Sequence, residues 1–350
     1  MPFIKITSPH TQGTTSTSGV MQTVLLATLP GLVALTVYFG PGTLLNVGLA
    51  AIAALVFEAA ALKLRKRPVM FFLKDYTALV TAVLLGLALP PYAPWWLVVV
   101  GIFFAIIVAK QLYGGMGYNP FNPAMVGYVV LLISFPLEMS QWAPPASTSG
   151  DLPGILVALQ QKFSGSGLDG YTGATPLDLL KQNQGLLLDA FYQQEPIFVE
   201  GRWAGAGWEW VNIAFLLGGA WLLYKRIFSW HAPVAMLAAL FLLSAIFYSG
   251  GSSASAGSPL FHWFSGGTML GAFFIVTDPV TSAVSKKGRL IFGAGAGVLI
   301  FVIRVWGNYP DAIAFAVLLM NFAAPFIDYY TVPRPYGQET PKRATAKDRD

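Results

Sequence analysis

The chain alternates between long apolar runs and short polar turns. Its ten apolar runs cover residues 20–39, 43–62, 77–90, 94–112, 121–136, 209–224, 232–248, 266–278, 289–305 and 311–327. A helix needs roughly 20 apolar residues to cross the hydrocarbon core of a bilayer, and most of the runs approach that length. The pattern therefore predicts an all-α polytopic membrane protein with about ten transmembrane helices.

One long polar segment, residues 137–207, separates the fifth run from the sixth. It is rich in Ser, Thr, Gly and Gln, and it holds seven acidic residues but only three basic ones. Loops of this length usually carry a function or are disordered. The expected organisation is a first membrane half over 1–136, this loop, a second membrane half over 208–328 and a cytoplasmic tail over 329–350.

The basic residues indicate the orientation in the membrane. If the N-terminus is cytoplasmic, 17 of the 21 Lys and Arg residues fall on the inner side, including the KLRKR run at 63–67. An excess of Lys and Arg on cytoplasmic loops is the usual signature of topology. We therefore expect a multi-pass protein of the bacterial inner membrane, with both termini cytoplasmic and residues 137–207 in the periplasm.

The composition agrees with the lipid bilayer as the main environment. Hydrophobic residues make up 55% of the chain and charged residues 11%, whereas soluble domains contain about 25% charged residues. The net charge of +5 reflects the basic loops and does not indicate a nucleic-acid partner. Because the chain has no cysteine, disulfides, zinc–thiolate sites and cysteine-ligated iron–sulfur clusters are excluded. No metal site is predicted, and electron transfer would need an organic cofactor.

The two membrane halves resemble each other. Residues 115–132 (GMGYNPFNPAMVGYVVLL) are similar to residues 305–319 (VWGNYPDAIAFAVLL), and residues 79–91 are similar to residues 269–281. Both offsets are about 190 residues. Because each half has five predicted helices, an odd number, the second copy must enter the membrane upside down. This is the inverted-repeat plan of many transporters, whose sites lie where broken helices of the two halves meet.

The sequence DGYTGATPLD within the polar segment has the features of a helix start. Thr175 is expected to be the N-cap, Pro176 the first helical residue and Asp178 the third, as in a capping box. On this interpretation alone the motif is a turn that leads into a short helix.

The same residues also match a modification motif. The string D-x-x-T-G-A-T, from Asp169 through Thr172, Gly173 and Ala174 to Thr175, resembles the flavinylation sequence D-x-x-[S/T]-G-A-[S/T]. At that sequence a transferase joins FMN through its phosphate to the final hydroxyl. Small residues let an enzyme approach the backbone, Asp169 offers a carboxylate for the metal ion of the transferase, and a helix start favours a phosphate.

Motifs along nearly the whole chain extend this resemblance. They are KDYTALVTAVLLGLALPP, GYNPFNPAMVGY, DGYTGATPL, FFIVTDPVTSAVSKKGR and IRVWGNYPDAIAFAVLLMN. With these motifs the chain resembles the D subunit of the Rnf electron-transport complex and, more distantly, the B subunit of the sodium-translocating NADH:quinone reductase.

The resemblance implies a membrane electron carrier with FMN bound covalently to Thr175 and a non-covalent riboflavin. It also implies a helical fold similar to that of urea transporters, which agrees with two inverted five-helix repeats. The implied partners are the other subunits of an Rnf-type complex, which couples electron flow between ferredoxin and NAD to Na+ or H+ transport, and a flavin transferase for maturation. Such a subunit is not active alone.

Two asparagines in GYNPFNPA, Asn119 and Asn122, are candidates for the non-covalent flavin site. The prolines beside them predict a helix start at or within the membrane. At helical spacing both amides can face one cavity, where they offer donors and acceptors to the polar edge of a neutral flavin ring. In the alternative interpretation, the two side chains only cap the helix.

Two acidic residues within the predicted spans are candidates for an ion path, because ionisable residues inside a membrane are usually functional. They are Glu58 in the second run and Asp278 in TDPVT. Alternatively, Glu58 pairs with Lys63 near the cytoplasmic end, and Asp278 ends a helix before Pro279.

A second class of function fits the same architecture. A solute channel or transporter of the urea-transporter type would also use an inverted-repeat pore, and DGYTGAT would then be only a turn. The presence or absence of a covalent flavin separates these two hypotheses.

Overall fold

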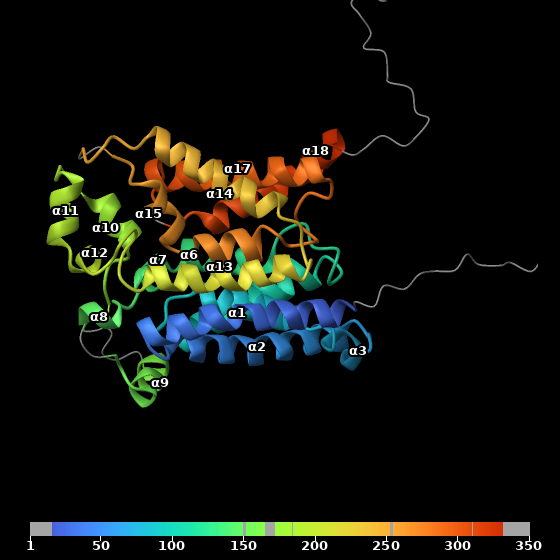
Figure 1. The fold of residues 1–350 in the computed structure, drawn as a ribbon. Helices are drawn as coiled ribbons and strands as arrows, with labels where there is room; N and C mark the ends of the chain where they lie inside the picture. Colours follow the sequence, from blue (N-terminus) through green and yellow to red (C-terminus); the bar gives the residue numbers. More distant parts are fainter. Residues whose placement is uncertain are drawn as a thin grey trace, which may run out of the picture.

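The computed structural model describes residues 16–149, 152–164, 172–183, 185–252, 255–309 and 311–331. These residues form helices and turns, with no strand among them and an isolated bridge between Trp142 and Gly173. Asp169 and nearly all of the predicted tail lie outside the described residues. The prediction of an all-α protein is confirmed, and the long helices lie side by side in one bundle (Figure 1).

The first half of the chain contributes five of the bundle's elements. They are α1 (Thr17–Phe39), α2 (Gly42–Leu64), α4 (Thr77–Ala88), α5 (Trp95–Phe103) with its π-helical continuation η1 (Phe104–Gln111), and α6 (Pro123–Ser134). A short helix, α3 (Val69–Leu73), joins α2 to α4.

The second half contributes a corresponding set. It consists of α13 (Trp208–Tyr224), α14 (His231–Ile246), α16 (Thr268–Leu270) with its π-helical continuation η3 (Gly271–Ile275), α17 (Lys286–Trp306) and α18 (Ile313–Thr331). A short helix, α15 (Pro259–Phe264), precedes α16.

Each predicted apolar run corresponds to one of these helices or to a helix with its π-helical continuation, but the lengths differ. Four helices, α1, α2, α17 and α18, are long and apolar enough by themselves to cross a membrane. The others are shorter, in part because of proline. Helix α4 ends at Ala88 rather than at residue 90, and η3 ends at Ile275 rather than at residue 278, since Pro90 and Pro279 lack the N–H that would continue each helix.

The polar segment folds as a set of short helices at one end of the bundle. They are α7 (Pro136–Ser140), α8 (Ala146–Ser149), α9 (Ile155–Ser164), α10 (Pro176–Gln182), α11 (Leu188–Gln194) and α12 (Pro196–Val199). The beginning of α1, the short α3 and the end of α18 lie at the opposite end (Figure 1). The described ends of the chain are therefore separated from the polar segment by the length of the bundle.

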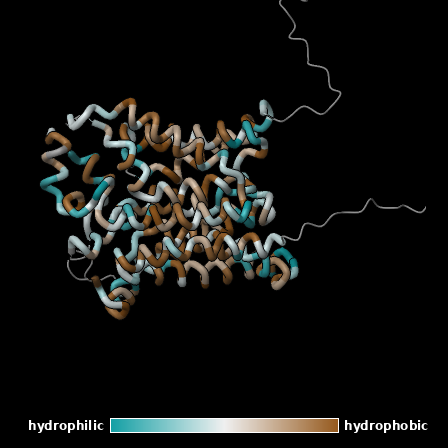
Figure 2. Tube along the Cα trace, viewed as in Figure 1, coloured by the Kyte–Doolittle hydropathy of each residue, from teal (hydrophilic) through white to brown (hydrophobic). Residues whose placement is uncertain are grey.

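The outer surface of the bundle is apolar, as a lipid-facing surface must be. Large apolar side chains such as Val33 on α1, Ile52 on α2 and Leu242 on α14 are more than half exposed. Figure 2 shows hydrophobic residues along the bundle and the most hydrophilic ones at its two ends. In lipid, exposed apolar groups do not drive helices together, so close packing must hold the bundle.

Glycines allow that close packing where α17 meets α14. Gly293 and Gly297 of α17 are four residues apart, and a Cβ atom at either position would lie 2.2 or 2.3 Å from a carbonyl oxygen of α14, that of Ala232 or Met236 respectively. Small residues at such spacing are typical of membrane helix pairs whose backbones approach each other. The α14–α17 contact therefore depends on the absence of side chains at these positions.

We expect Gly293→Leu and Gly297→Leu each to destabilise the protein by about 1–3 kcal/mol or more, because a backbone carbonyl cannot move aside as a side chain can. Thermal unfolding of the purified chain in detergent measures this effect. Gly48→Leu is the matched control, since a Cβ atom on Gly48 of α2 would meet nothing within 4 Å. Equal melting temperatures for all three variants would contradict the prediction.

Candidate functional site

The candidate attachment residue, Thr175, is the N-cap of α10. Its hydroxyl accepts a hydrogen bond from the N–H of Asp178 at 3.2 Å, and its own N–H donates to Asp178 Oδ2 at 3.2 Å. The Thr175 hydroxyl also donates to Asp178 Oδ2 at 2.6 Å. The predicted capping box is thus confirmed. The side chain is largely buried, with 9% of its surface exposed.

The residues before Thr175 dock onto the end of the bundle. The Gly173 N–H donates to the carbonyl oxygen of Trp142 at 2.8 Å, and a Cβ atom on Gly173 would lie 3.3 Å from Pro144. Thr172 is half-buried and Ala174 is exposed. The absence of a side chain at Gly173 therefore permits the close contact with the segment around Trp142.

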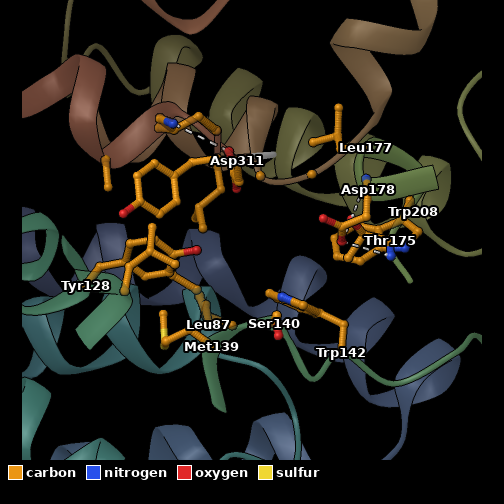
Figure 3. Close-up of a pocket in the computed structure, with 18 of the residues that line it drawn as sticks. Leu87, Tyr128, Met139, Ser140, Trp142, Thr175, Leu177, Asp178, Trp208 and Asp311 are labelled. Atoms are coloured by element: carbon orange, nitrogen blue, oxygen red, sulfur yellow. Dashed lines mark hydrogen bonds between the residues drawn. The ribbon is translucent and has the colours of Figure 1, made fainter. Parts of the chain in front are cut away.

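A cavity of about 290 Å³ opens beside Thr175. Its wall comes from both membrane halves and from the polar segment, with Leu87, Met125, Phe215, Leu270 and Ile313 among the apolar residues. Figure 3 shows Thr175 and Asp178 on one side of this cavity, and Tyr128 and Asp311 across from them. Small-molecule sites typically have volumes of about 300–1,000 Å³, so the cavity lies just below that range.

Aromatic rings form part of the same wall. Trp142 and Trp208 both line the cavity, and their ring centroids are 5.1 Å apart at an interplanar angle of 57°. Trp208 also packs on Phe39 at 5.0 Å. These contacts hold the indole rings in place next to Thr175, so they provide a fixed apolar surface for a flat ligand.

A buried arginine supports the opposite wall. Arg304 lies 3.7 Å from the carboxylate of Asp311 and donates at 2.9 Å to the carbonyl oxygen of His262 and to the Thr268 hydroxyl. Burial, with the nearby Arg304, lowers the pKa of His262 to about 3, so that ring is neutral. Its Nε2 lies 2.8 Å from the carbonyl oxygen of Ala256 and, in the neutral ring, donates to it. Asp311 therefore reaches the cavity from this wall, whereas Asp178 reaches it from the other, and neither Arg304 nor His262 lines it.

A second cavity, of about 180 Å³, contains two of the predicted site residues. Asn122 and Asp278 both line it, although 156 positions separate them in the sequence. The Asn122 side-chain amide donates to Asp278 Oδ2 at 3.4 Å. The two residues were predicted as parts of different sites, and the fold brings them together at the contact between the two halves.

Asn122 combines this contact with a capping role. Its Oδ1 accepts from the N–H groups of Ala124 and Met125 at 3.1 and 3.3 Å, as the alternative interpretation of the motif predicted. Its backbone N–H donates to Asn321 Oδ1 at 3.0 Å. Asn321 was not predicted as a site residue. The sequence feature that could have indicated it is a single amide side chain within an otherwise apolar run. Helix α18 is thereby tied to the start of α6.

The other predicted residues have separate surroundings. Asn119 is buried, donates to the carbonyl oxygen of Phe121 at 3.1 Å and is not among the residues that line the second cavity. Asp278 accepts from the Val280 N–H at 3.1 Å and from the Thr281 hydroxyl at 2.9 Å, so it also caps the turn after η3. The two asparagines therefore do not share this cavity.

Glu58 is buried in a polar cluster within the first half. It pairs with Lys110 at 3.0 Å and accepts from Gln111 at 2.7 Å, so its partner is Lys110 and not the neighbouring Lys63. Lys110 also donates to the Thr77 hydroxyl at 2.9 Å. The cluster joins α2, α4 and η1.

The sequence matches the NQR2, RnfD, RnfE family over residues 4–337. The chain belongs to this family. It is 63% identical to the D subunit of the ion-translocating oxidoreductase complex of Cellvibrio japonicus, over 99% of this chain and 98% of that protein. Identically named proteins of Ectopseudomonas mendocina and Pseudomonas aeruginosa are 60% and 58% identical, over 97% and 98% of this chain and 98% of each relative.

Membership of the family confirms the resemblance deduced from the motifs. The match covers the two membrane halves and the polar segment between them, so it is a match to the whole architecture. The relatives have nearly the same length as this chain, because the alignments cover almost all of both partners.

Proposed function

We propose that this protein is the flavin-carrying membrane subunit of an Rnf-type ion-translocating ferredoxin:NAD oxidoreductase complex. The observation that carries the proposal is the Thr175 hydroxyl at the wall of a cavity that both membrane halves share. The names of the relatives, which are subunits of ion-translocating oxidoreductase complexes, support the same assignment. The other subunits would supply and accept the electrons.

The residues around Thr175 suit a covalently attached FMN. The cavity is mostly apolar with two indole rings in its wall, which favours a flat aromatic ring system, and Thr175 opens into it. FMN would supply the redox chemistry by accepting and donating electrons. The protein would hold the ring out of water and fix its distance from the periplasmic end of the bundle.

The hydrogen bonds between Thr175 and Asp178 indicate which contacts a covalently attached FMN would change. The Thr175 hydroxyl loses its hydrogen when the phosphoester forms, so it can no longer donate to Asp178 at 2.6 Å. A phosphate beside that carboxylate is repelled by it, and α10, with seven residues, has only a short helix dipole to offset the repulsion. We therefore expect Asp178 to turn toward the backbone N–H of Thr175, its remaining partner in the capping box.

Purification of the chain after coexpression with a flavin transferase tests the proposed function. The denatured protein should fluoresce in a gel under ultraviolet light, and its flavin should be reducible by reduced ferredoxin or NADH in the intact complex. A chain that carries no covalent flavin when the transferase is present would favour the solute channel or transporter.

We propose that the protein has ten spans in two inverted halves, the urea-transporter-like fold that the family resemblance implies, and contacts within the structure support the correspondence of the two halves. Helix α1 packs on α13 and α6 packs on α18, which pairs corresponding helices across the two halves. Lys110 donates to Thr77 at 2.9 Å in the first half, and Arg304 donates to Thr268 at 2.9 Å in the second. Thr77 is the first residue of α4 and Thr268 is the first residue of α16, which are the third elements of the two halves. In each half, a basic residue of the fourth element therefore donates to the first residue of the third.

We propose that the protein lies in the inner membrane of a bacterium with both termini in the cytoplasm. The beginning of α1 and the end of α18 lie at one end of the bundle and α7–α12 at the other, as Figure 1 shows. A reporter that is active only in the cytoplasm should therefore be silent when fused after Gln182 and active when fused after Lys225. The reverse pattern would overturn this orientation and place Thr175 away from a periplasmic transferase.

We propose that a non-covalent riboflavin binds at the second cavity, beside Asn122. An amide and a carboxylate from different halves would offer both a donor and an acceptor to the flavin edge. The cavity is smaller than the range typical of small-molecule sites, so a flavin there would have to displace lining side chains. Asn119 would not contact the riboflavin. It would affect the site only by holding the turn that leads to Asn122, through its hydrogen bond to the carbonyl oxygen of Phe121.

Asn122→Leu is expected to weaken flavin binding roughly tenfold to a hundredfold, because a lost polar contact costs about 1–3 kcal/mol. Acid-extractable flavin in the purified protein should fall while Thr175 stays flavinylated. Asn122→Ser keeps an oxygen that can cap α6 but lacks the amide N–H groups. If it loses as much flavin as Asn122→Leu, the missing amide and not the missing cap is the cause. Asn119→Leu should retain the flavin, and wild-type protein without any extractable flavin would contradict the proposal.

Glu58 and Asp278 remain our candidates for the ion path. Glu58 is buried and ion-paired, and Asp278 lies at the contact between the two halves. An intramembrane carboxylate at such a contact is suited to bind a cation transiently. Asp278→Asn should lower Na+ or H+ uptake by the reconstituted complex while the covalent flavin at Thr175 remains, and unchanged uptake would remove Asp278 from the path.

A further inference from the structure

Helix α9 has its polar and apolar faces reversed relative to a helix on a water-exposed surface. Gln161 and Lys162 point into the protein, with 3% and 2% of their surfaces exposed. Leu156 and Phe163 point outward, with 77% and 58% exposed. A helix that borders water normally buries its apolar face and exposes its charges, so the outer face of α9 is not shaped for water.

Specific hydrogen bonds hold the polar face inward. The Lys162 ammonium donates to the Asn46 side-chain oxygen and, at 2.7 Å, to the carbonyl oxygen of Ala93. Asn46 is itself fixed, because its amide donates to the carbonyl oxygen of Pro90 at 2.8 Å. Burial lowers the pKa of Lys162 to about 8. The two hydrogen bonds of Lys162 fix the rotation of α9 about its own axis.

The contact with Asn46 also defines the depth of α9. Asn46 lies about one turn inside the end of α2, which begins at Gly42. Helix α9 packs on α2 at this level. The exposed Leu44 of α2 lies on the same turn, and Ile52 and Val56 continue the exposed apolar surface toward the middle of the bundle. Helix α9 therefore lies beside the end of a helix whose exposed apolar side chains face lipid.

We infer that α9 is an interfacial helix whose outward face, formed by Ile155, Leu156 and Phe163, is embedded among the acyl chains of the adjacent lipid leaflet. In Figure 1, α9 lies beyond α2 on the outside of the bundle, and Figure 2 shows hydrophobic residues on it. Interfacial helices typically insert their apolar face about 5–10 Å into the boundary between head groups and acyl chains. The contact between α9 and α2 lies about one helical turn, roughly 5 Å, from the end of α2, which is where an interfacial helix would lie.

This anchor lies directly before the flavin attachment motif. The motif ends at Thr175, and α9 ends at Ser164 on the N-terminal side of it. Gly173, which precedes Thr175 by two residues, is held by its hydrogen bond to Trp142, so both α9 and Gly173 fix the chain on the N-terminal side of Thr175. Only the choice of leaflet, the outer one, rests on the orientation proposed above. The insertion of α9 does not depend on it.

The absence of native cysteine permits a direct test by spin labelling. Single cysteines at Leu156 and Phe163 are labelled with a nitroxide in the full chain, reconstituted in phospholipid vesicles. Collision with oxygen, which concentrates in lipid, is compared with collision with a water-soluble nickel chelate. The matched controls are Ile52→Cys on the lipid-facing side of α2 and Gln193→Cys on the exposed surface of α11.

The labels at Leu156 and Phe163 should show a ratio of oxygen to nickel collisions several-fold above that of Gln193→Cys and near that of Ile52→Cys. A ratio equal to that of Gln193→Cys would overturn the inference. The measurement is repeated in the intact complex. Loss of oxygen collisions there at Leu156, but not at Ile52, would show that a neighbouring protein of the complex covers this face, and would likewise overturn the assignment to lipid.

Discussion

Thr175→Ala is expected to abolish the covalent flavin completely while the protein still folds. The variant lacks the hydroxyl that would form the phosphoester. It also lacks the side-chain half of the capping box, a loss of about 1 kcal/mol that α10 and its packing should tolerate. The measurement is fluorescence of the denatured band after coexpression with the flavin transferase, with the amount of folded protein followed by size-exclusion chromatography.

Three variants separate attachment from capping and recognition. Thr175→Ser keeps both a cap and a hydroxyl, so it should be flavinylated. Asp178→Ala removes the capping partner and leaves the hydroxyl, so it should also carry flavin, as should Thr172→Ala to at least some extent. A fluorescent Thr175→Ala band would show that another residue carries the flavin, whatever the behaviour of the other three.

Lys110→Met is expected to destabilise the protein by about 3–5 kcal/mol, because it leaves the buried Glu58 carboxylate without its counter-ion. Glu58 would retain the Gln111 amide at 2.7 Å, which offers a dipole in place of a charge. The ammonium contact with Thr77 would be lost as well. Thermal unfolding in detergent measures the change, and it should exceed the effect of Lys63→Met, which removes a lysine that does not contact Glu58.

The double variant Glu58→Gln/Lys110→Met tests whether charge is the cause. It removes both ions and keeps a polar side chain for Gln111, so most of the lost stability should return. Equal instability in the single and double variants would instead indicate that packing of the Lys110 side chain is responsible. Ion uptake by the reconstituted complex that contains the double variant then reports on the Glu58–Lys110 pair, because the fold of that variant is expected to be intact.

The sequence by itself determined the elements and the local chemistry of this protein. Runs of apolar residues specify helices in a bilayer because every backbone polar group must find its partner within the helix. Thr175, Pro176 and Asp178 specify the start of α10 because an N-cap and its partner are only three residues apart. The flavinylation string and the family motifs are likewise continuous in the sequence, so they were recognisable without a fold.

Only the tertiary structure decided which distant groups meet. Glu58 pairs with Lys110 rather than with the nearby Lys63, since the side of α2 that carries Glu58 faces η1. Asn122 contacts Asp278 because the two halves pack against each other. The reversed faces of α9 were also not evident from its sequence, because the partners of Lys162 lie on α2 and beyond it. Local propensity acts over a few residues, whereas burial, cavities and ion pairs depend on how helices far apart in the chain come together.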